Sequence, residues 1–192
     1  IGRAMDEVVR IAEEGNWKGI VIGNNGKQFS VGANLMNVGM LAMQKQFEPL
    51  GQMIDDFQQI NMRIRTSKIP VVVATQGYVF GGGCEIAMHC DAGIYAAESY
   101  IGLVEVGVGL LPGGGGTKEF AVRASDEFFE GDVQSPTLIK YFKTIATAAV
   151  STSAYEAYDL NYLKEGRDFV SVNTPMNIGL AKDKVLQLSK NY

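Results

Sequence analysis

Residues 69–90 read IPVVVATQGYVFGGGCEIAMHC, which is an apolar run, a glycine cluster and a second apolar segment in succession. The run over 69–75 has the continuous hydrophobicity of a strand that is buried on both faces of a parallel sheet. The glycines at 81–83 follow it, and residues 82–90 have the composition of a mostly apolar helix. This stretch therefore predicts a buried strand, a glycine-lined turn and a helix packed on the sheet.

The sequence around this stretch repeats the same alternation of short apolar runs and helical patterns. Residues 18–23 and 91–96 are two further runs that are typical of buried strands. Helical spacing of apolar residues predicts helices over 3–14 and 35–66, the second broken near 49–51. The chain is therefore expected to be an α/β protein with helices on the faces of a parallel sheet.

The sequence becomes mostly helical after this region. We predict 1–123 as the core, and 124–192 as an insertion followed by a helical C-terminal region of the same domain. Within the latter, 124–135 is expected to be an irregular surface segment and 169–173 a brief strand. Thr174 is expected to cap the last helix, because a proline follows it.

Composition excludes several classes of protein. Seventeen Lys and Arg against 21 Asp and Glu give a net charge of −4 with no basic stripe, which argues against nucleic acid as a partner. No apolar run approaches the roughly 20 residues of a membrane span, and the N-terminus lacks a signal-peptide pattern. Two cysteines make no disulfide framework, so a cytoplasmic location is expected.

The single histidine, His89, excludes histidine-based triads and histidine-rich zinc sites. No metal is therefore expected, and the spacing of Cys84, His89 and Cys90 does not match a zinc site. Two buried thiols and a packed or surface imidazole explain this trio better. Any chemistry has to come from carboxylates, hydroxyls or the backbone.

Twelve of the 23 glycines lie within residues 77–116, which indicates that this region requires backbone without side chains. A phosphate-binding P-loop is not present, because the glycines at 113–116 lead into Thr117 and Lys118 in the reversed order. The dinucleotide fingerprint Gly-x-Gly-x-x-Gly and the nucleophile elbow Gly-x-Ser-x-Gly are also missing. Nucleotide binding by these loops is therefore not expected.

Glycines at the start of a helix suit a different use. Their backbone N–H groups have no intrahelical acceptor, carry the positive end of the helix dipole, and can approach a ligand oxygen without a Cβ in the way. Such an oxyanion hole would stabilise a developing negative charge on an acyl oxygen. The alternative is that the glycines at 81–83 only permit tight helix–sheet packing.

Two isolated carboxylates accompany these glycines. Glu85 lies one turn into the helix that the triple glycine opens, and Glu105 lies in the apolar, glycine-rich segment 102–107. A buried charge is costly unless it is paired or used, and two nearby carboxyls can divide acid and base roles. Each of them alone could equally be a solvent-facing glutamate.

The segments 26–35 and 77–117 resemble the enoyl-CoA hydratase/isomerase (crotonase) family. The resemblance covers most of 4–123. The remainder, with its insertion at 124–135 and the segment 151–163, looks like the hydratase module of bacterial fatty-acid oxidation proteins that also carry a 3-hydroxyacyl-CoA dehydrogenase. The family resemblance implies a crotonase-like (ClpP/crotonase) core of repeated ββα units wound into a superhelix. We expect an N-terminally truncated form of it, because the family's first strands and its last trimer-forming helices have no counterpart.

The resemblance also implies site residues. Ala33 and Gly82 would donate backbone N–H groups to the thioester oxygen, with Glu85 as base towards water and Glu105 as acid. It assigns to substrate binding Val31, Gly32, Asn34, Leu35, Met36, Phe80, Gly81, Val104, Pro112 and Gly113. Asn34 stands where the family usually has Asp, and as a helix N-cap it serves equally well.

The function that this resemblance implies is a lyase that adds water to a 2-enoyl-CoA in fatty-acid β-oxidation. A Δ3,Δ2-enoyl-CoA isomerase and a non-catalytic acyl-CoA-binding or assembly module are the alternatives. Hydration needs no cofactor beyond the coenzyme A of its substrate, and NAD would serve only a dehydrogenase domain elsewhere in the polypeptide. A trimer-type homo-oligomer or a fused dehydrogenase is the expected partner.

Three methionines at helical spacing follow the first of these segments. Met36, Met40 and Met43 could line an adaptable acyl pocket, because methionine is flexible and polarisable. Ordinary core packing explains them equally well.

Overall fold

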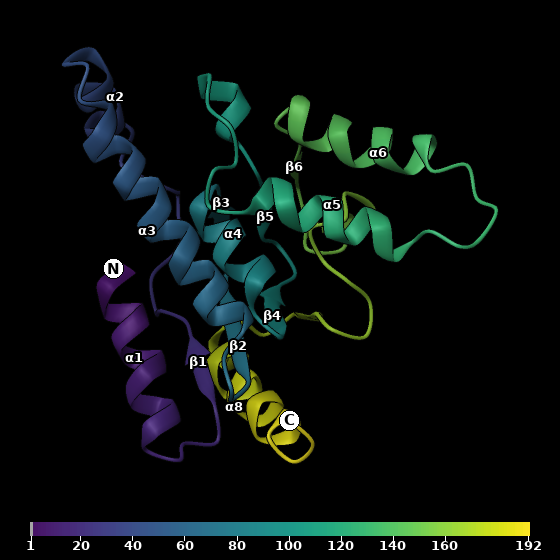
Figure 1. Ribbon diagram of the computed structural model, residues 1–192. Helices are drawn as coiled ribbons and strands as arrows, with labels where there is room; N and C mark the ends of the chain where they lie inside the picture. The colour runs from purple at the N-terminus through teal and green to yellow at the C-terminus, as the bar shows by residue number, and fades with distance from the viewer. Residues whose placement is uncertain (1) are drawn as a thin grey trace.

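The computed structural model describes residues 2–192, and a four-stranded parallel sheet lies at its centre (Figure 1). The strand order is β1-β2-β4-β7, with β1 spanning Ile20–Ile22, β2 Val71–Thr75, β4 Ala92–Ala96 and β7 Phe169–Ser171. Every residue of β2 and β4 is buried. The apolar runs at 69–75 and 91–96 thus become the inner strands, as parallel sheets require, whereas the run at 18–23 becomes β1, a half-buried strand at the edge.

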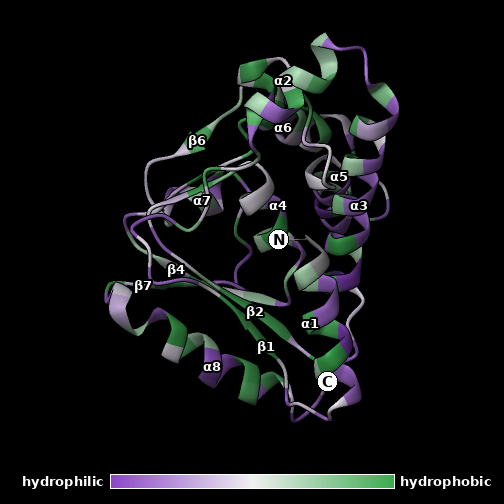
Figure 2. Ribbon diagram, turned by 90° about the vertical axis from the view of Figure 1, so that its left-hand side faces the viewer, coloured by the Kyte–Doolittle hydropathy of each residue, from purple (hydrophilic) through white to green (hydrophobic). Residues whose placement is uncertain are grey.

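Helices cover both faces of this sheet, as Figure 2 shows for α8 below the strands and α1 and α4 above them. Helix α8 (Asn177–Leu188) packs Ala181 and Val185 against Val72 and Ala74 of β2. The opposite face carries α3 (Phe47–Arg65) and α4 (Gly82–His89), with α1 (Gly2–Glu14) beside α3. The alternate side chains of β2 therefore belong to two different apolar layers.

A second, three-stranded sheet lies above the first. Strand β3 (Tyr78–Phe80) pairs in parallel with β5 (Tyr100–Gly102), which pairs antiparallel with β6 (Val150–Ser151). The chain thus passes from β2 through β3 into α4, which is one ββα unit, and β4 followed by β5 starts the next. These units wind into the superhelical α/β core that the sequence predicts.

The remaining elements flank this core. The 3₁₀ turn η1 (Glu105–Val108) leads to α5 (Gly116–Asp126), and α6 (Ser135–Ala146) lies alongside α5 in Figure 1. The rings of Phe120 and Tyr141 join these two helices edge to face at 5.2 Å between centroids. Short α7 (Glu156–Asp159) and the 3₁₀ turn η2 (Thr174–Met176) precede α8, and α2 (Leu35–Met43) lies at one end of α3.

Three element boundaries differ from the sequence-based prediction. The long helix breaks at residues 44–46, where Lys45 has a φ of 56°, whereas Pro49 lies in the first turn of α3, where proline is tolerated. Residues 124–126 continue α5, so the irregular segment is shorter than predicted. Thr174 opens η2 rather than the last helix, which begins at Asn177. The side chain of Asn177 donates to the carbonyl of Thr75, which ties that helix start to the end of β2.

Within the described residues, no helix has both the length and the apolar character needed to cross a membrane.

Candidate functional site

The turn between β3 and α4 exposes the first N–H groups of a helix. Gly81 adopts a φ of 52°, and its own N–H donates to the carbonyl of Gly102 at 2.9 Å. Gly82 and Gly83 are the first residues of α4, where a helix offers their N–H groups no acceptor. A methyl group on Gly83 would overlap the Cβ of Ser30, so the close approach of that loop requires glycine here.

The loop that follows β1 is held against this turn by backbone hydrogen bonds. The N–H of Ser30 donates to the carbonyl of Tyr78 at 2.9 Å, and the N–H of Phe80 donates to the carbonyl of Ser30 at 3.0 Å. Gly32 has a φ of 89°, and a methyl group on it would lie 3.9 Å from the nitrogen of Gly82. The loop therefore reaches the N-terminus of α4.

Ala33 directly follows Gly32, so the two predicted oxyanion donors lie on adjoining segments. Asn34 caps α2 by accepting the N–H of Met36 at 3.0 Å, which is the role predicted for it. This cap fixes the direction in which the chain leaves the loop.

Glu85 is 2% exposed and points from α4 to the start of α5. Its Oε1 accepts the N–H of Gly116 at 2.8 Å, and a methyl group on Gly114 would lie 2.5 Å from its Oε2. Burial raises the pKa of Glu85 from 4.5 to about 7, although the N–H of Gly116 acts in the opposite direction. The negative charge of Glu105 adds to this rise.

The loop that binds Glu85 is itself anchored to α3. The side-chain amides of Gln58 and Asn61 donate to the carbonyls of Gly113 and Gly114, at 2.6 Å and 2.7 Å. The carbonyls of this glycine loop thus face α3, whereas its amide groups face Glu85.

Glu105 begins the turn η1 and lies close to the same helix N-terminus. A methyl group on Gly81 would lie 3.1 Å from its Oε1. Its Oε2 is buried and has no hydrogen-bond partner within the described part of the chain. Burial raises the pKa of Glu105.

The two carboxyls therefore have different surroundings. Glu85 is bound by a backbone N–H at the positive end of α5, which favours its ionised form, whereas Glu105 has no such donor for its Oε2. Both pKa values are raised, and the value of Glu85 lies near neutral pH. Such a pair can exchange protons with a bound molecule as base and acid.

An apolar groove of about 600 Å³ opens beside this site between α2, α3 and the segment after η1. It is lined by Val38, Leu50, Ile54, Val106, Gly109, Leu110, Leu111 and Gly113. Of the predicted substrate-binding residues only Gly113 lines the groove. Leu50 and Ile54 were missed, although their spacing of four on one helix was an available signal.

The other predicted binding residues are less enclosed or serve the backbone. Val31, Leu35 and Met36 are 67%, 47% and 83% exposed, and Val104 is half-buried next to Glu105. Phe80 stacks on the ring of Tyr78 at 4.8 Å between centroids, and Pro112 is buried. Gly81 and Gly32 lie at the helix turn, as described.

The three methionines of α2 do not pack into a core. Met36, Met40 and Met43 are 83%, 53% and 86% exposed, and no residue of α2 is buried. Core packing is therefore the wrong explanation for them, because α2 contacts the rest of the chain mainly along α3.

Across residues 2–192 the side chains form no group of three or more His, Cys, Asp or Glu that could hold a metal ion. Cys84 and Cys90 are unpaired thiols, both buried. His89 is a buried side chain, 1% exposed, and so it is packed rather than at the surface.

Fold and site together define a superhelical ββα protein in which the glycine-built N-terminus of α4 lies beside the half-buried Glu105, and the buried Glu85 of the same helix meets the start of α5. A family model described as enoyl-CoA hydratase/isomerase matches residues 4–129 of the sequence. The chain belongs to the enoyl-CoA hydratase/isomerase family.

The curated relatives that the chain matches are longer than the chain itself. It is 45% identical over 160 residues to a probable 3-hydroxyacyl-CoA dehydrogenase of Bacillus subtilis, covering 83% of this chain and 20% of that protein. It is 39% identical over 101 residues to a crotonyl-CoA hydratase of Syntrophomonas wolfei, covering 52% of this chain and 36% of that protein. The chain thus spans a minor part of either relative.

Solved structures share the fold. An enoyl-CoA hydratase from Polaromonas sp. JS666 superposes with a TM-score of 0.79 at 24% identity, over 98% of this chain and 66% of that one. DspI of Pseudomonas aeruginosa superposes with a TM-score of 0.74 at 20% identity, over 100% of this chain and 70% of that one. The crotonase-like architecture predicted from the sequence is confirmed.

Proposed function

We propose that this chain is an enoyl-CoA hydratase, a lyase that adds water across the 2,3-double bond of a 2-enoyl-CoA. The observation that carries the proposal is the pair of carboxyls with raised pKa values: Glu85, buried on the first turn of α4, and Glu105, half-buried beside the N-terminus of that helix. The crotonyl-CoA hydratase named among the relatives acts on a substrate of this class.

The first part of the mechanism is polarisation of the substrate. The thioester carbonyl accepts the N–H groups of Gly82 and Ala33, which lie on adjoining segments. Negative charge that moves onto this oxygen during addition is stabilised there, and one such donor contributes roughly 3–4 kcal/mol to a transition state. Polarisation also makes the β-carbon electrophilic.

The second part is proton transfer around one water molecule. Glu85, whose ionised form the N–H of Gly116 favours, takes a proton from water as the oxygen forms its bond to the β-carbon. The electron pair of the double bond moves toward the α-carbon and the thioester. Glu105, protonated at the start, gives its proton to the α-carbon, and the product is a 3-hydroxyacyl-CoA.

The net reaction transfers no electrons to or from the protein, so hydration needs no redox cofactor. The acyl chain would lie in the apolar groove that contains Leu50 and Ile54. Because a relative at 45% identity is named a probable 3-hydroxyacyl-CoA dehydrogenase, we propose that the chain can supply its product to such an activity, whose NAD would bind outside these residues.

A direct test follows the loss of conjugated-enoyl absorbance when the protein is mixed with a short 2-enoyl-CoA. Glu85→Gln and Glu105→Gln are each expected to lower kcat by at least about 100-fold, because each removes a proton-transfer group. The exposed Glu98→Gln is the matched control and should leave kcat unchanged. Saturable binding of the enoyl-CoA without turnover would refute the enzyme proposal, and double-bond migration that survives loss of one carboxyl would favour isomerisation instead.

A further inference from the structure

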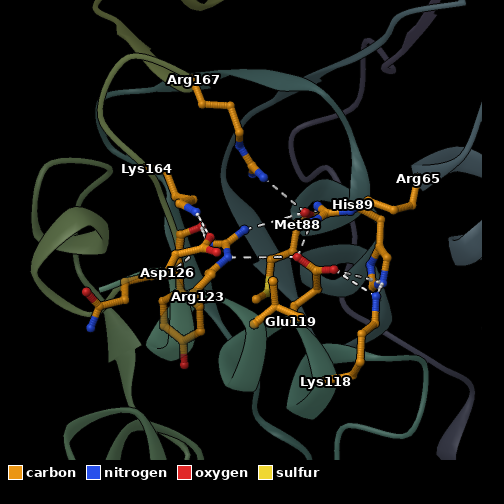
Figure 3. Close-up of polar contacts among 12 residues, drawn as sticks. Arg65, Met88, His89, Lys118, Glu119, Arg123, Asp126, Lys164 and Arg167 are labelled. Carbon is orange, nitrogen blue, oxygen red and sulfur yellow. Dashed lines mark hydrogen bonds and ion pairs between the residues drawn. The ribbon is translucent and has the colours of Figure 1, made fainter. Parts of the chain in front are cut away.

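Behind the carboxyl pair lies a polar cluster that the proposed reaction does not use, buried at His89 and Glu119 and exposed at Lys118 and Arg65. It centres on His89, whose side chain is fully buried at the C-terminal end of α4. Figure 3 shows this imidazole meeting Lys118 and Glu119, two residues of α5. His89 lies four residues after Glu85, which puts the two on the same side of the helix.

The two ring nitrogens of His89 have partners that fix the tautomer. Nδ1 lies 2.6 Å from the carbonyl oxygen of Glu85, which can only accept a hydrogen bond, so Nδ1 carries the hydrogen. Nε2 lies 2.9 Å from Nζ of Lys118, which can only donate, so Nε2 is bare. His89 is therefore a neutral bridge between the backbone of α4 and a side chain of α5.

Lys118 joins three helices at this point. Its ammonium lies 2.9 Å from His89 of α4, 2.8 Å from Oε1 of Glu119 of α5, and 3.5 Å from Sδ of Met62 of α3. Oε2 of Glu119 in turn accepts from Arg65 of α3 at 3.2 Å. The charged groups that face His89 are thus Arg65, Lys118 and Glu119.

His89 also packs against the loop that binds the Glu85 carboxylate. A methyl group on Gly115 would lie 2.9 Å from Cε1 of His89, so the ring borders this loop directly. The next residue is Gly116, whose N–H holds Oε1 of Glu85. One imidazole therefore contacts both the backbone of Glu85 and the loop that binds its side chain.

We propose that His89, with Lys118, is a positioning residue for Glu85: it sets the start of α5 so that the Gly116 N–H stays on the Glu85 carboxylate. This role deepens the proposed function and rests on it, because it concerns the base of that reaction. His89 is buried against the backbone of Glu85 and the loop at Gly115, so in this proposal it acts only through Glu85.

Loss of the His89 side chain should raise the pKa of Glu85. The N–H of Gly116 lowers the pKa of Glu85, so a loosened α5 start must raise that pKa further. In His89→Leu the acid limb of the kcat profile should move to higher pH, and kcat should fall roughly 100-fold with KM within about twofold. A role confined to stability would lower the melting temperature without moving the pKa of Glu85.

Two polar substitutions test the two hydrogen bonds of the His89 imidazole separately. His89→Asn retains a donor at the Nδ1 position, and His89→Gln retains an acceptor at the Nε2 position. Each is expected to recover part of the kcat lost in His89→Leu, and Lys118→Met should behave like His89→Asn. Tyr141→Phe is the structural control, because its hydroxyl bonds Glu127 at the far end of α5.

A second measurement does not depend on turnover. The pKa of the Glu85 carboxyl is read by carbon NMR in the wild type, His89→Leu and Tyr141→Phe. His89 is the one histidine of the chain, so its ring nitrogen signals are assigned without ambiguity and should report the Nδ1–H tautomer.

The positioning role is supported if the pKa of Glu85 rises in His89→Leu and not in Tyr141→Phe. It is overturned if the pKa of Glu85 is the same in folded His89→Leu and wild type, or if the ring carries its hydrogen on Nε2. Should His89→Leu fail to fold, His89→Asn and Lys118→Met decide the question by the same comparison. A wild type without hydratase turnover defeats the proposed function alone, since the NMR titration still reads the Glu85 pKa.

Discussion

Replacing Glu85 by glutamine should make the fold more stable while removing the proposed base. In the folded protein the pKa of this carboxyl rises from 4.5 to about 7, chiefly because burial disfavours the charge. A rise of this size corresponds to about 3 kcal/mol of unfavourable ionisation. Glutamine keeps a side-chain oxygen for the Gly116 N–H and carries no charge.

The direction in which stability changes with pH follows from the protons that Glu85 binds in the folded and unfolded states. A carboxyl whose pKa is raised on folding stabilises the protein fully below its unfolded value of 4.5, and this contribution is lost as the pH rises through about 7. The wild type therefore loses about 3 kcal/mol over this range that Glu85→Gln retains. For a chain of 192 residues this amounts to roughly 6–12 °C in melting temperature.

The assay is chemical denaturation of both proteins at pH 4 and pH 8, with Glu98→Gln as an exposed control. The advantage of Glu85→Gln over the wild type should grow by about 3 kcal/mol between the two pH values. A difference that stays constant with pH would show that Glu85 is not held in an unfavourably charged state. Such a result would refute the argument that burial tunes this group.

Three further predictions concern the parts of the fold that hold the site. Gly83→Ala should destabilise the fold by about 1–3 kcal/mol, because its Cβ would overlap Ser30, whereas Gly39→Ala has open space and should stabilise α2 slightly. Asn34→Ala should cost about 1 kcal/mol in the same denaturation assay through loss of the α2 cap, and Asn34→Asp should cost almost nothing. The pKa of His89 falls from 6.5 to about 4 through burial, so the wild type should lose about 3 kcal/mol of stability between pH 6.5 and 4, relative to His89→Gln.

For each of these three predictions, a specific stability measurement would contradict it. Equal stability of Gly83→Ala and Gly39→Ala would mean that the Ser30 loop can move aside. Identical unfolding of Asn34→Ala and wild type would show that the cap does not support α2. A wild type and a His89→Gln variant with parallel stability curves below pH 6.5 would contradict the buried, neutral imidazole.

The fold was readable from the sequence where local signals agreed. The apolar runs became β1, β2 and β4, and the triple glycine became the N-terminus of α4. Strands β3, β5 and β6 were missed, because they have only two or three residues each and are specified by pairing partners rather than by their own pattern. Short strands of this kind carry too little periodicity to be recognised in isolation.

The candidate site was predictable where a residue carried a local signal in the sequence, and not where its partners are distant in the chain. Glu85 and Glu105 stood out because each is a lone charge in an apolar segment. The structure brings Glu85 to the start of α5 and Glu105 to the start of α4, close enough for the charge of Glu105 to raise the pKa of Glu85. His89 offered no such signal, since its partners come from α5, about thirty residues further along the chain. Its place beside Glu85 follows from helix spacing, but its contact with Gly115 depends on how α4 and α5 pack.

The position of α8 in this fold has a consequence for how the chain folds. The helix covers the face of β2 formed by Val72 and Ala74, and Asn177 bonds Thr75, which is 102 residues earlier in the sequence. During synthesis these central strands stay without their covering layer until the last part of this segment leaves the ribosome. Contacts of such long range slow folding, and the exposed apolar face is open to association with other chains in the interval. We therefore expect shortened chains that end before α8 to aggregate rather than to fold as smaller domains.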